Sequence, residues 1–465
     1  MKSNLKRLGA FLLTAVLAVG MVGCSSDKTE KDEQGRTIVK IGGYPEKDNE
    51  SRPTWDERIA RFEKNNPDVN VEPIEWNFNL QVFYSQAYGG QLPNLISTNF
   101  TEVVPAARAG VVADLTDVIK KYGYDKMLNQ QIVETLKYDG NMYSLPKSAY
   151  VLGLIYNVDI FEQAGLMNAD GTPMVPETWD ELVEFGLKIK EKTGKYALVI
   201  PTIKNTGGWL FTPIAWSYGV EFVKENEDGT YTATFDSPEA VAALQFMKDL
   251  KWKHGLIPED VLIDNSRKKE IFGTGGAAMI IDSGSNVTQF GTYDMDNNII
   301  GAMGLPAGPK KHVTLMGGAA FMMSDDTSEE QQDAIIRWIK DEVSYELTDE
   351  IKNNIENSRK SDVEKGVLVG VKPLSIWSQD TEYNKYCNEM VDKYANVNIN
   401  HVKPYNDFVA DCPAEIRPEE RICAQELYGI LDKCLQEVWT SEDADVEKII
   451  KQANDDFQRD YLDNY

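Results

Sequence analysis

The chain has 465 residues, with 74 acidic against 48 basic side chains and a net charge of −26 at pH 7. This excess of negative charge repels nucleic acid and anionic lipid, so neither is an expected partner. A chain of this length is too long for one hydrophobic core, so two lobes or domains are expected.

The first residues have the features of an export signal. Basic residues precede an apolar run, Leu8 to Val22, which is shorter than the roughly 20 residues of a membrane-spanning helix. The run ends in Met21-Val22-Gly23-Cys24, which resembles a bacterial lipobox, where the cysteine takes the lipid. The alternative is an ordinary signal peptide with an incidental cysteine. We expect residues 1–23 to be a signal peptide and Cys24 to carry a lipid that holds the protein on the outer face of the cell membrane.

Residues 24–36 form a polar segment between this signal and the first predicted strand. The segment is rich in Ser, Asp, Lys and Glu and has no apolar pattern. Such a composition buries too little apolar surface to fold, so the segment is predicted to be a disordered tether.

Beyond the tether, short runs of branched residues alternate with well-capped helical segments. Strands are predicted at 37–41, 69–74, 94–98, 151–156, 196–200, 277–281 and 301–306. Helices are predicted from capping boxes at Thr54 and Thr178, from Leu80, from Ser237 with Pro238 after it, and over 446–461. The alternation predicts an α/β fold with a largely parallel sheet, which gives way to a mainly helical region after residue 236.

Four cysteines follow Cys24, namely Cys387, Cys412, Cys423 and Cys434. Two disulfides and four free thiols are both possible in an exported chain. Cys423 and Cys434 fall on one predicted helix about 16 Å apart, which is too far for a bond between them. There is no Cys-x-x-Cys, no His-Glu-x-x-His and no phosphate-binding Gly-Lys-Ser/Thr loop, so neither a metal nor another cofactor is expected.

Five segments, taken in order, resemble the family 1 extracellular solute-binding proteins of bacterial ABC importers, the group that includes the maltose-binding protein. They are residues 138–161, 176–182, 235–240, 272–284 and 317–321. The resemblance covers roughly residues 37–340, whereas residues 341–435 fit the family poorly and are expanded.

The resemblance implies an α/β fold of the two-lobed, type II periplasmic-binding-protein kind, with hinge crossovers and a helical C-terminal region. Lobe 1 would comprise residues 37–147 plus 320–370, and lobe 2 residues 148–319 plus 371–465. The resemblance also implies that the protein is a monomer that binds a solute and catalyses no reaction. The partners would be a carbohydrate, expected by analogy with the family to be an oligosaccharide, and the permease subunits of an ABC importer.

Sugar rings present apolar faces edged by hydroxyl groups, so a sugar site needs aromatic rings and polar side chains. Candidates were chosen on loops after strands, where α/β folds place ligands, and at the crossovers. They are Tyr44, Asn99, Glu102, Tyr150, Trp209, Trp216, Ser283, Ser285, Gly317, Gly318 and Trp377. Many relatives carry Gly-Pro-Trp where this chain has Gly284-Ser285-Asn286, so Trp377 is expected to supply the missing platform. Core packing is the alternative for each tryptophan and is favoured for Trp55, Trp179 and Trp252.

Two other functions fit the same sequence. A cationic solute such as a polyamine or an amino-sugar compound would need clustered carboxylates in the cleft, for which Glu46, Asp48 and Glu102 are candidates. A surface polysaccharide hydrolase would need two carboxylates about 5 to 10 Å apart across a groove.

Overall fold

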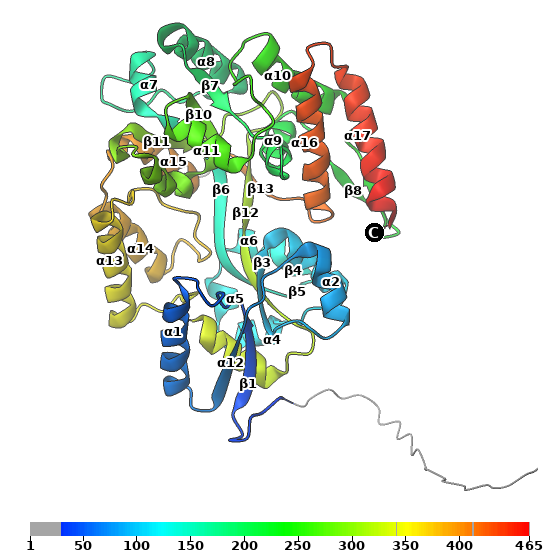
Figure 1. The fold of residues 1–465 in the computed structure, drawn as a ribbon, viewed down its shortest axis with the longest axis vertical. Coiled ribbons are helices and arrows are strands. Elements are labelled where there is room, and N and C mark those ends of the chain that lie inside the picture. The colour runs from blue at the N-terminus through cyan, green and yellow to red at the C-terminus, as the bar shows by residue number, and fades with distance from the viewer. Residues whose placement is uncertain (1–28, 341, 412, 465) are drawn as a thin grey trace, which may run out of the picture.

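The computed structural model describes residues 29–464 apart from 341 and 412. Two lobes lie one above the other and are joined by two long strands, β6 (Leu145–Asn157) and β12 (Val313–Met323), that run from one lobe into the other (Figure 1). The predicted signal peptide and Cys24 lie outside the described residues. Within the described part of the chain, no helix combines the length and the apolar character that crossing a bilayer requires.

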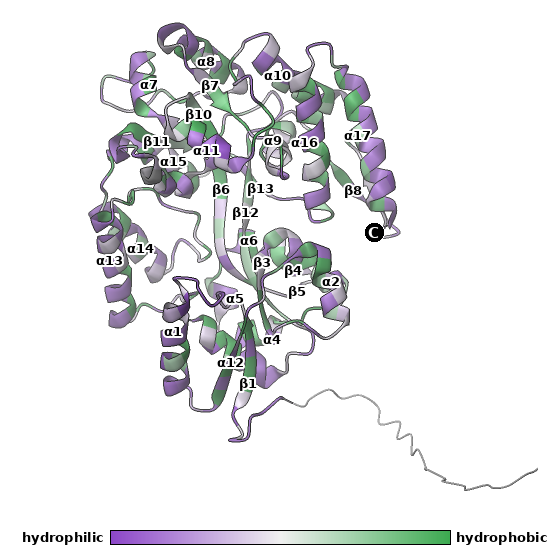
Figure 2. Cartoon of the chain, in the orientation of Figure 1, coloured by the Kyte–Doolittle hydropathy of each residue, from purple (hydrophilic) through white to green (hydrophobic). Residues whose placement is uncertain are grey.

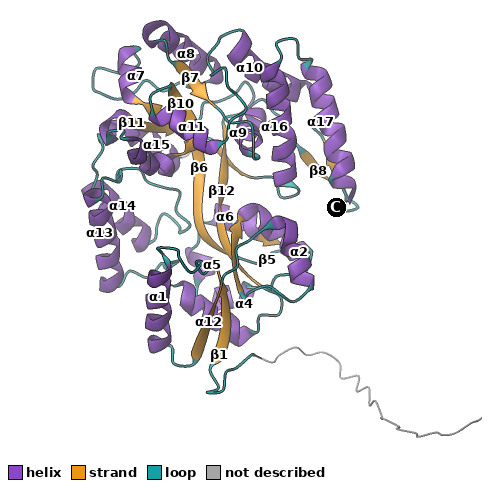
Figure 3. Cartoon of the chain, in the orientation of Figure 1, coloured by secondary structure: helices purple, strands orange, loops and turns teal. Residues whose placement is uncertain are grey.

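The remaining strands are short and alternate with helices (Figure 3). They are β1 (Thr37–Gly42), β2 (Val69–Ile74), β3 (Leu95–Asn99), β4 (Lys137–Tyr138), β5 (Asn141–Met142), β7 (Tyr196–Val199), β8 (Val223–Glu225), β9 (Tyr231–Ala233), β10 (Ala277–Ser283), β11 (Ile300–Gly304) and β13 (Glu415–Pro418).

The helices cover both lobes and form most of the chain after β12. They are α1 (Arg52–Asn65), α2 (Leu80–Tyr88), α3 (Val103–Arg108), α4 (Thr116–Lys121), α5 (Tyr124–Met127), α6 (Gln130–Leu136), α7 (Val158–Gln163), α8 (Trp179–Thr193), α9 (Thr206–Ser217), α10 (Pro238–Trp252), α11 (Asn265–Gly273), α12 (Glu329–Ile339), α13 (Asp349–Glu364), α14 (Glu382–Lys393), α15 (Ile399–Asp411), α16 (Ala424–Thr440) and α17 (Val446–Asp460). Two 3-10 segments, η1 (Phe100–Glu102) and η2 (Gly284–Tyr293), follow β3 and β10.

The strands pair in the order β2-β1-β3-β12-β6-β10-β7, with β11 on β6 and β13 on β12. Lobe 1 contains the parallel strands β1, β2 and β3, and lobe 2 contains β7, β10 and β11. The expected α/β class is confirmed, but the sheet is mixed instead of largely parallel. The reason is that β6 and β12 are antiparallel to each other, and both also pair antiparallel with lobe strands.

The two predicted capping boxes have different outcomes. Thr178 accepts a hydrogen bond from the backbone N–H of Glu181 at 3.2 Å and starts α8, but the Glu181 carboxylate accepts from the N–H of Glu177 at 2.8 Å, so only the threonine half of the predicted box forms. The box at Thr54 does not form, because α1 already begins at Arg52 with Pro53 in its first turn. Proline suits that turn, since its fixed φ is helical and its missing N–H would have no partner there.

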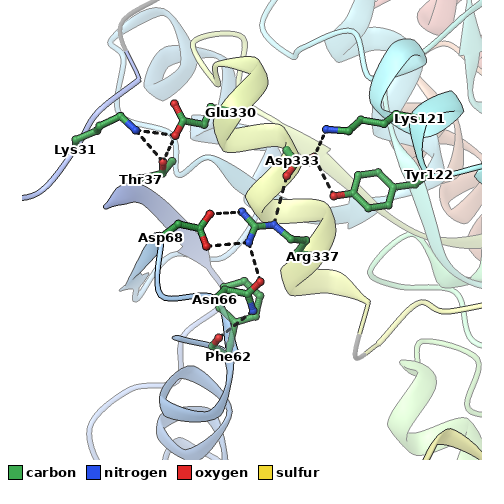
Figure 4. Close-up of polar contacts among 10 residues, drawn as sticks. All are labelled: Lys31, Thr37, Phe62, Asn66, Asp68, Lys121, Tyr122, Glu330, Asp333 and Arg337. Atoms are coloured by element: carbon green, nitrogen blue, oxygen red, sulfur yellow. Dashed lines mark hydrogen bonds and ion pairs between the residues drawn. The ribbon is translucent and has the colours of Figure 1, made fainter. Parts of the chain in front are cut away.

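The predicted tether is ordered from Thr29 onward, so the expectation of disorder through residue 36 is wrong for that part. Lys31 Nζ and Thr37 Oγ1 each donate to Glu330 Oε1 of α12, both at 2.6 Å (Figure 4). The same helix places Arg337 against Asp68 after α1, with 2.8 Å between Arg337 Nη2 and Asp68 Oδ2. Polar contacts to α12 therefore order this part of the segment without any apolar pattern.

The expanded region contacts both lobes. The backbone N–H of Lys372 donates to Asn406 of α15, which packs along β11 of lobe 2. A few residues later the Ile376 carbonyl accepts from the N–H of Asn129 in lobe 1 at 2.8 Å. The expectation that the chain joins lobe 2 from residue 371 onward is therefore wrong near Trp377, because the aromatic core of lobe 1 takes that side chain.

Hydrophobic residues are concentrated on the central strands and on the helix faces that cover them, whereas α13 is mostly hydrophilic, with Ile351, Ile355 and Val363 as its apolar residues (Figure 2). None of the α13 side chains is buried. The helix therefore lies on the flank of the molecule beside α14 and adds little to either core (Figure 1).

Candidate functional site

A cavity of about 190 Å³ lies between the lobes beside the crossover strands. Its walls come from lobe 1 at the end of β3, from β6 and β12, from the start of α9 in lobe 2, and from the chain leading into α16. The lining residues are Asn99, Tyr150, Lys204, Asn205, Thr206, Trp209, Gly318, Glu419, Gln425 and Tyr428. An occupant of this cavity would touch both lobes, which is the geometry that couples binding to lobe closure.

The start of α9 is held against α16 by an aspartate and a glycine, Asp432 and Gly208. Asp432 of α16 accepts from the N–H groups of Asn205 and Gly208, each at 2.7 Å, and so caps the positive end of α9. A Cβ at Gly208 would collide with the Tyr428 carbonyl, so only glycine permits this helix contact. Asn205 itself has φ of 64°, a left-handed conformation that starts the helix abruptly. These contacts fix the backbone from which Trp209 projects.

Trp209 and Tyr150 form the aromatic part of the cavity. Their rings meet edge to face, with centroids 6.1 Å apart and an interplanar angle of 84°. Both side chains are partly buried, so each ring is packed in place and still lines the cavity. A rigid pair of aromatic rings beside amide and carboxyl groups has the composition required to bind a sugar.

The carboxyl group of Glu419 lies at the crossover strands. Tyr428 Oη donates to Glu419 Oε1 at 3.0 Å. A Cβ added at Gly317 would collide with the Tyr150 hydroxyl and would lie 3.0 Å from Glu419 Oε2. Glycine at this position of β12 therefore lets both polar groups reach the crossover backbone. Burial raises the pKa of Glu419 to about 7, against the opposing hydrogen bond from Tyr428 and with a smaller contribution from the charge of Glu102.

Glu102 is buried beside the cavity but does not line it. Burial raises its pKa, the charge of Glu426 adds to the shift, and a 2.9 Å hydrogen bond from Thr101 opposes it. Glu420, next to Glu419, has an ion pair with Arg417 at 3.2 Å, yet burial still raises its pKa.

The structure brings together four of the predicted site residues: Asn99, Tyr150, Trp209 and Gly318 line one cavity. Gly317 lies directly behind it at Tyr150 and Glu419. Reasoning from the sequence missed Lys204, Asn205, Thr206, Glu419, Gln425 and Tyr428. The signal for the first three was their position immediately before Trp209, whereas the last three lie in the part of the chain that the family resemblance covered poorly.

Three predicted aromatic residues have other roles. Trp216 is fully buried in the lobe 2 core, under the guanidinium group of Arg417. Trp377 is 2% exposed and packs against Tyr124 at 5.6 Å between centroids, so the prediction that it replaces a missing platform is not supported by its burial. The hydroxyl of Tyr44 donates to Asp56 at 2.5 Å, away from the residues that line the cavity.

The two predicted serines lie at the end of β10 and bond to each other, with 2.7 Å between Ser283 Oγ and Ser285 Oγ. Neither lines the interlobe cavity. The segment is fixed by a buried ion pair, in which Lys268 Nζ lies 2.9 Å from Asp282 Oδ2. Although burial opposes ionisation, Lys268 and Asn286 hold the pKa of Asp282 below its ordinary value.

Other concave regions have different linings. Glu46 and Asp48 border a separate depression together with Glu75, so they do not join Glu102 in a carboxylate cluster. A wider groove of about 890 Å³ runs between β6, α13 and α14. Among the described residues, no group of three or more His, Cys, Asp or Glu side chains is arranged to hold a metal ion. Cys387, Cys423 and Cys434 carry free thiols.

One contact joins the lobes at the far side of the cavity from α13. Arg108 of α3 donates to Tyr231 Oη of β9 at 2.8 Å, and its guanidinium group lies 5.1 Å from the centre of that ring. Gln458 of α17 accepts from the N–H of Ala233 at 2.7 Å and so fixes the β8–β9 hairpin to lobe 2. The arginine therefore links lobe 1 to a hairpin that is anchored in lobe 2.

Comparison with known proteins gives a consistent family. The family model described as bacterial extracellular solute-binding protein matches residues 48–340. The putative ABC transporter periplasmic-binding protein YcjN of Escherichia coli is 26% identical over 283 residues, which cover 58% of this chain and 60% of that protein. The maltodextrin-binding protein MdxE of Bacillus subtilis is 23% identical over 375 residues, covering 78% of this chain and 84% of that one.

The match with YcjN therefore covers less than two thirds of that protein, whereas the match with MdxE covers more than two thirds of it. Among solved structures, the maltose-bound MalE3 of T. maritima has a TM-score of 0.64 at 20% identity, covering 91% of this chain and 99% of that one. UgpB from Mycobacterium tuberculosis, in complex with glycerophosphocholine, has a TM-score of 0.64 at 18% identity, covering 91% and 98%. These likenesses establish the two-lobed fold.

Proposed function

Because the chain belongs to the family of bacterial extracellular solute-binding proteins, we propose that it captures a carbohydrate, specifically an oligosaccharide, between its lobes and delivers it to an ABC importer. The observation that carries the proposal is the interlobe cavity, in which Trp209 and Tyr150 lie beside amide and carboxyl groups from both lobes. Aromatic rings cover the apolar faces of a sugar, and the polar groups bond its hydroxyls. A monomer suffices for this role, since one chain supplies every wall of the cavity.

The relatives support a sugar in preference to other solutes. The maltodextrin-binding protein of B. subtilis and the multiple sugar-binding protein of Streptococcus mutans are both named for carbohydrates. A fold neighbour holds glycerophosphocholine, so a non-sugar solute is the second candidate. The carboxyl groups at the cavity are the feature that would suit a cationic solute such as a polyamine. A hydrolase has no support, because the family binds solutes and is not one of enzymes.

A thermal-shift screen of the mature protein tests this function. At 100 times its dissociation constant, the bound ligand is expected to add about 2.7 kcal/mol to the free energy of unfolding, because it binds the folded state alone. Mono- and oligosaccharides, polyamines and glycerophosphodiesters should be screened in parallel. We expect a shift with a glycan. A shift with a polyamine or a phosphodiester and with no glycan would contradict the proposal.

We also propose that Cys24 carries a lipid that holds the protein at the outer face of the cell membrane. The support is the short apolar run that ends in Met21-Val22-Gly23-Cys24. Replacing Cys24 with alanine is expected to release the protein from the membrane fraction and to abolish labelling by a radioactive fatty acid. If the wild-type protein is itself found in the medium without a fatty-acid label, and the alanine variant is secreted in the same way, the signal peptide is an ordinary one and the proposal is contradicted.

A further inference from the structure

Glu419 is the carboxyl group of the interlobe cavity that the protein leaves without a cation. Its Oε1 accepts the hydroxyl of Tyr428 at 3.0 Å, and its side chain lines the cavity. In the part of the chain that the structure describes, no lysine, arginine or histidine forms an ion pair with it, although Glu420 beside it is paired with Arg417. The two adjacent glutamates therefore differ: Glu420 is paired with an arginine of the protein, whereas Glu419 lines the cavity and has no such partner.

The titratable groups near Glu419 do not neutralise it. The charge of Glu102 of η1 raises the pKa of Glu419, and Glu426 of α16 acts on Glu102 in the same direction, while burial keeps the hydroxyls of Tyr150 of β6 and Tyr428 of α16 protonated and neutral. The lysine of the cavity, Lys204, is exposed, and its Nζ already lies 2.7 Å from Asp264. A cationic group that enters beside Glu419 therefore meets a buried carboxyl group without a protein cation, and it would offset the cost of ionising that carboxyl group.

The aromatic rings of the same cavity favour a cation independently of the carboxylate. Tyr150 and Trp209 both line it, and the negative faces of tyrosine and tryptophan rings attract ammonium groups within about 6 Å. Aromatic rings and a carboxylate in one small cavity form a combination that recognises an amine attached to an otherwise apolar or hydroxylated body.

We propose that the carbohydrate bound by this protein carries a free amino group, and that Glu419 is the residue that selects it. The proposal rests on the proposed carbohydrate-binding function and names the class of sugar: an amino sugar, or an oligosaccharide that contains one. The ammonium group lies beside Glu419 and replaces the cation that the protein lacks there, while the sugar rings contact Trp209 and Tyr150.

Matched sugars test the proposal in the full mature protein. Glucosamine, N-acetylglucosamine and glucose, as monomers and as β-1,4-linked oligomers, are titrated by calorimetry together with galactosamine and galactose. The aminated member of a pair is expected to bind at least about tenfold more tightly than its neutral partner, since hydrogen bonds to charged groups exceed neutral ones. The substitution Glu419→Gln is expected to remove the preference, and Glu420→Gln, the matched control, to keep it.

The pH dependence gives a readout that a purely structural role of Glu419 would not change. A carboxyl group with a pKa of about 7 is mostly protonated at pH 5.5, so the aminated ligand must displace a proton there. The preference is therefore expected to be smaller at pH 5.5 than at pH 7, although the amine itself is more fully charged at the lower pH. Glu419→Gln removes this pH dependence.

The outcomes separate the two proposals. Equal or tighter binding of the neutral sugars, or an amine preference that survives in folded Glu419→Gln, overturns the selection of an amino group and leaves carbohydrate binding intact. If no aminated or neutral glycan binds the wild-type protein, the proposed function fails and this inference fails with it. The unfolding midpoint of each variant, measured without ligand, establishes that the variant is folded.

Discussion

Replacing Trp209 with alanine is expected to weaken carbohydrate binding by about 30-fold or more. Truncating a buried aromatic residue at the centre of a binding site typically costs at least about 2 kcal/mol. Trp209 is partly buried in the free protein, and a ligand in the cavity would cover the exposed part of its ring, which meets Tyr150 edge to face at 6.1 Å. Asp432 and Gly208 fix the helix start beneath it, so the backbone that carries residue 209 is expected to stay in place after the substitution.

Calorimetric titration of the tightest glycan from the screen measures this effect. Trp209→Phe should retain part of the affinity, since it keeps an aromatic face. Tyr88→Ala is the control at a distant site, where the ring is 72% exposed, and should bind like the wild type. Binding by folded Trp209→Ala within twofold of the wild-type value would show that the aromatic pair does not hold the ligand.

Replacing Lys268 with methionine is expected to lower the free energy of unfolding by about 3–5 kcal/mol at pH 7, the usual effect of removing one partner of a buried ion pair. Lys268 is fully buried, and its Nζ also donates to the Ile281 carbonyl at 3.0 Å. The substitution leaves the Asp282 carboxylate buried without its cation. Chemical unfolding in urea, followed by circular dichroism, measures the loss.

The pH dependence of this loss follows from the pKa of Asp282. In the wild-type protein Lys268 holds that pKa down despite burial, so the pair stabilises the fold above the ordinary pKa of aspartate and is lost as the pH falls through the depressed value. Without Lys268 the buried carboxyl group of Asp282 binds a proton more readily, and the loss of stability relative to the wild type should shrink from pH 7 to pH 5.

The control for this substitution is Arg267→Met, on the exposed face of the same helix, which should change the free energy of unfolding by less than about 0.5 kcal/mol. A loss that is no larger for Lys268→Met than for this control would contradict the account.

Helix starts were predicted correctly from the sequence where a single capping residue determines the local structure. Thr178 starts α8, and Ser237 starts α10 by accepting from the N–H of Ala240 at 3.2 Å. The mixed sheet was not predictable in this way, because strand direction is set by pairings between distant segments. The ordered structure of the segment that begins at Thr29 also depends on contacts between distant parts of the chain, since the partner of Lys31 is Glu330 of α12.

The candidate site was predictable only where it follows a strand or a crossover. Asn99, Tyr150 and Gly318 were selected by that rule, and Trp209 because residues 207–216 resemble the cleft helix of the family. The assignment of Trp377 as a ligand platform is not supported by its burial, which could not be foreseen because exposure cannot be read from a tryptophan in a poorly matched region. Glu419 was missed for a related reason. Its role depends on the pairing of β13 with β12, which brings residues 415–418 to the crossover, and no local pattern indicates that pairing.

Hydrogen exchange with and without the tightest glycan from the screen tests the central claim, which is that the ligand is held between the lobes. Mass spectrometry should follow peptides at the end of β3 (99–102), at the start of α9 (204–209) and at the chain entering α16 (419–428). Slower exchange is expected in all three peptides, since each contains residues that line the one cavity between the lobes. Slower exchange in one lobe alone, or only along the groove beside α13 and α14, would place the ligand elsewhere and contradict the account.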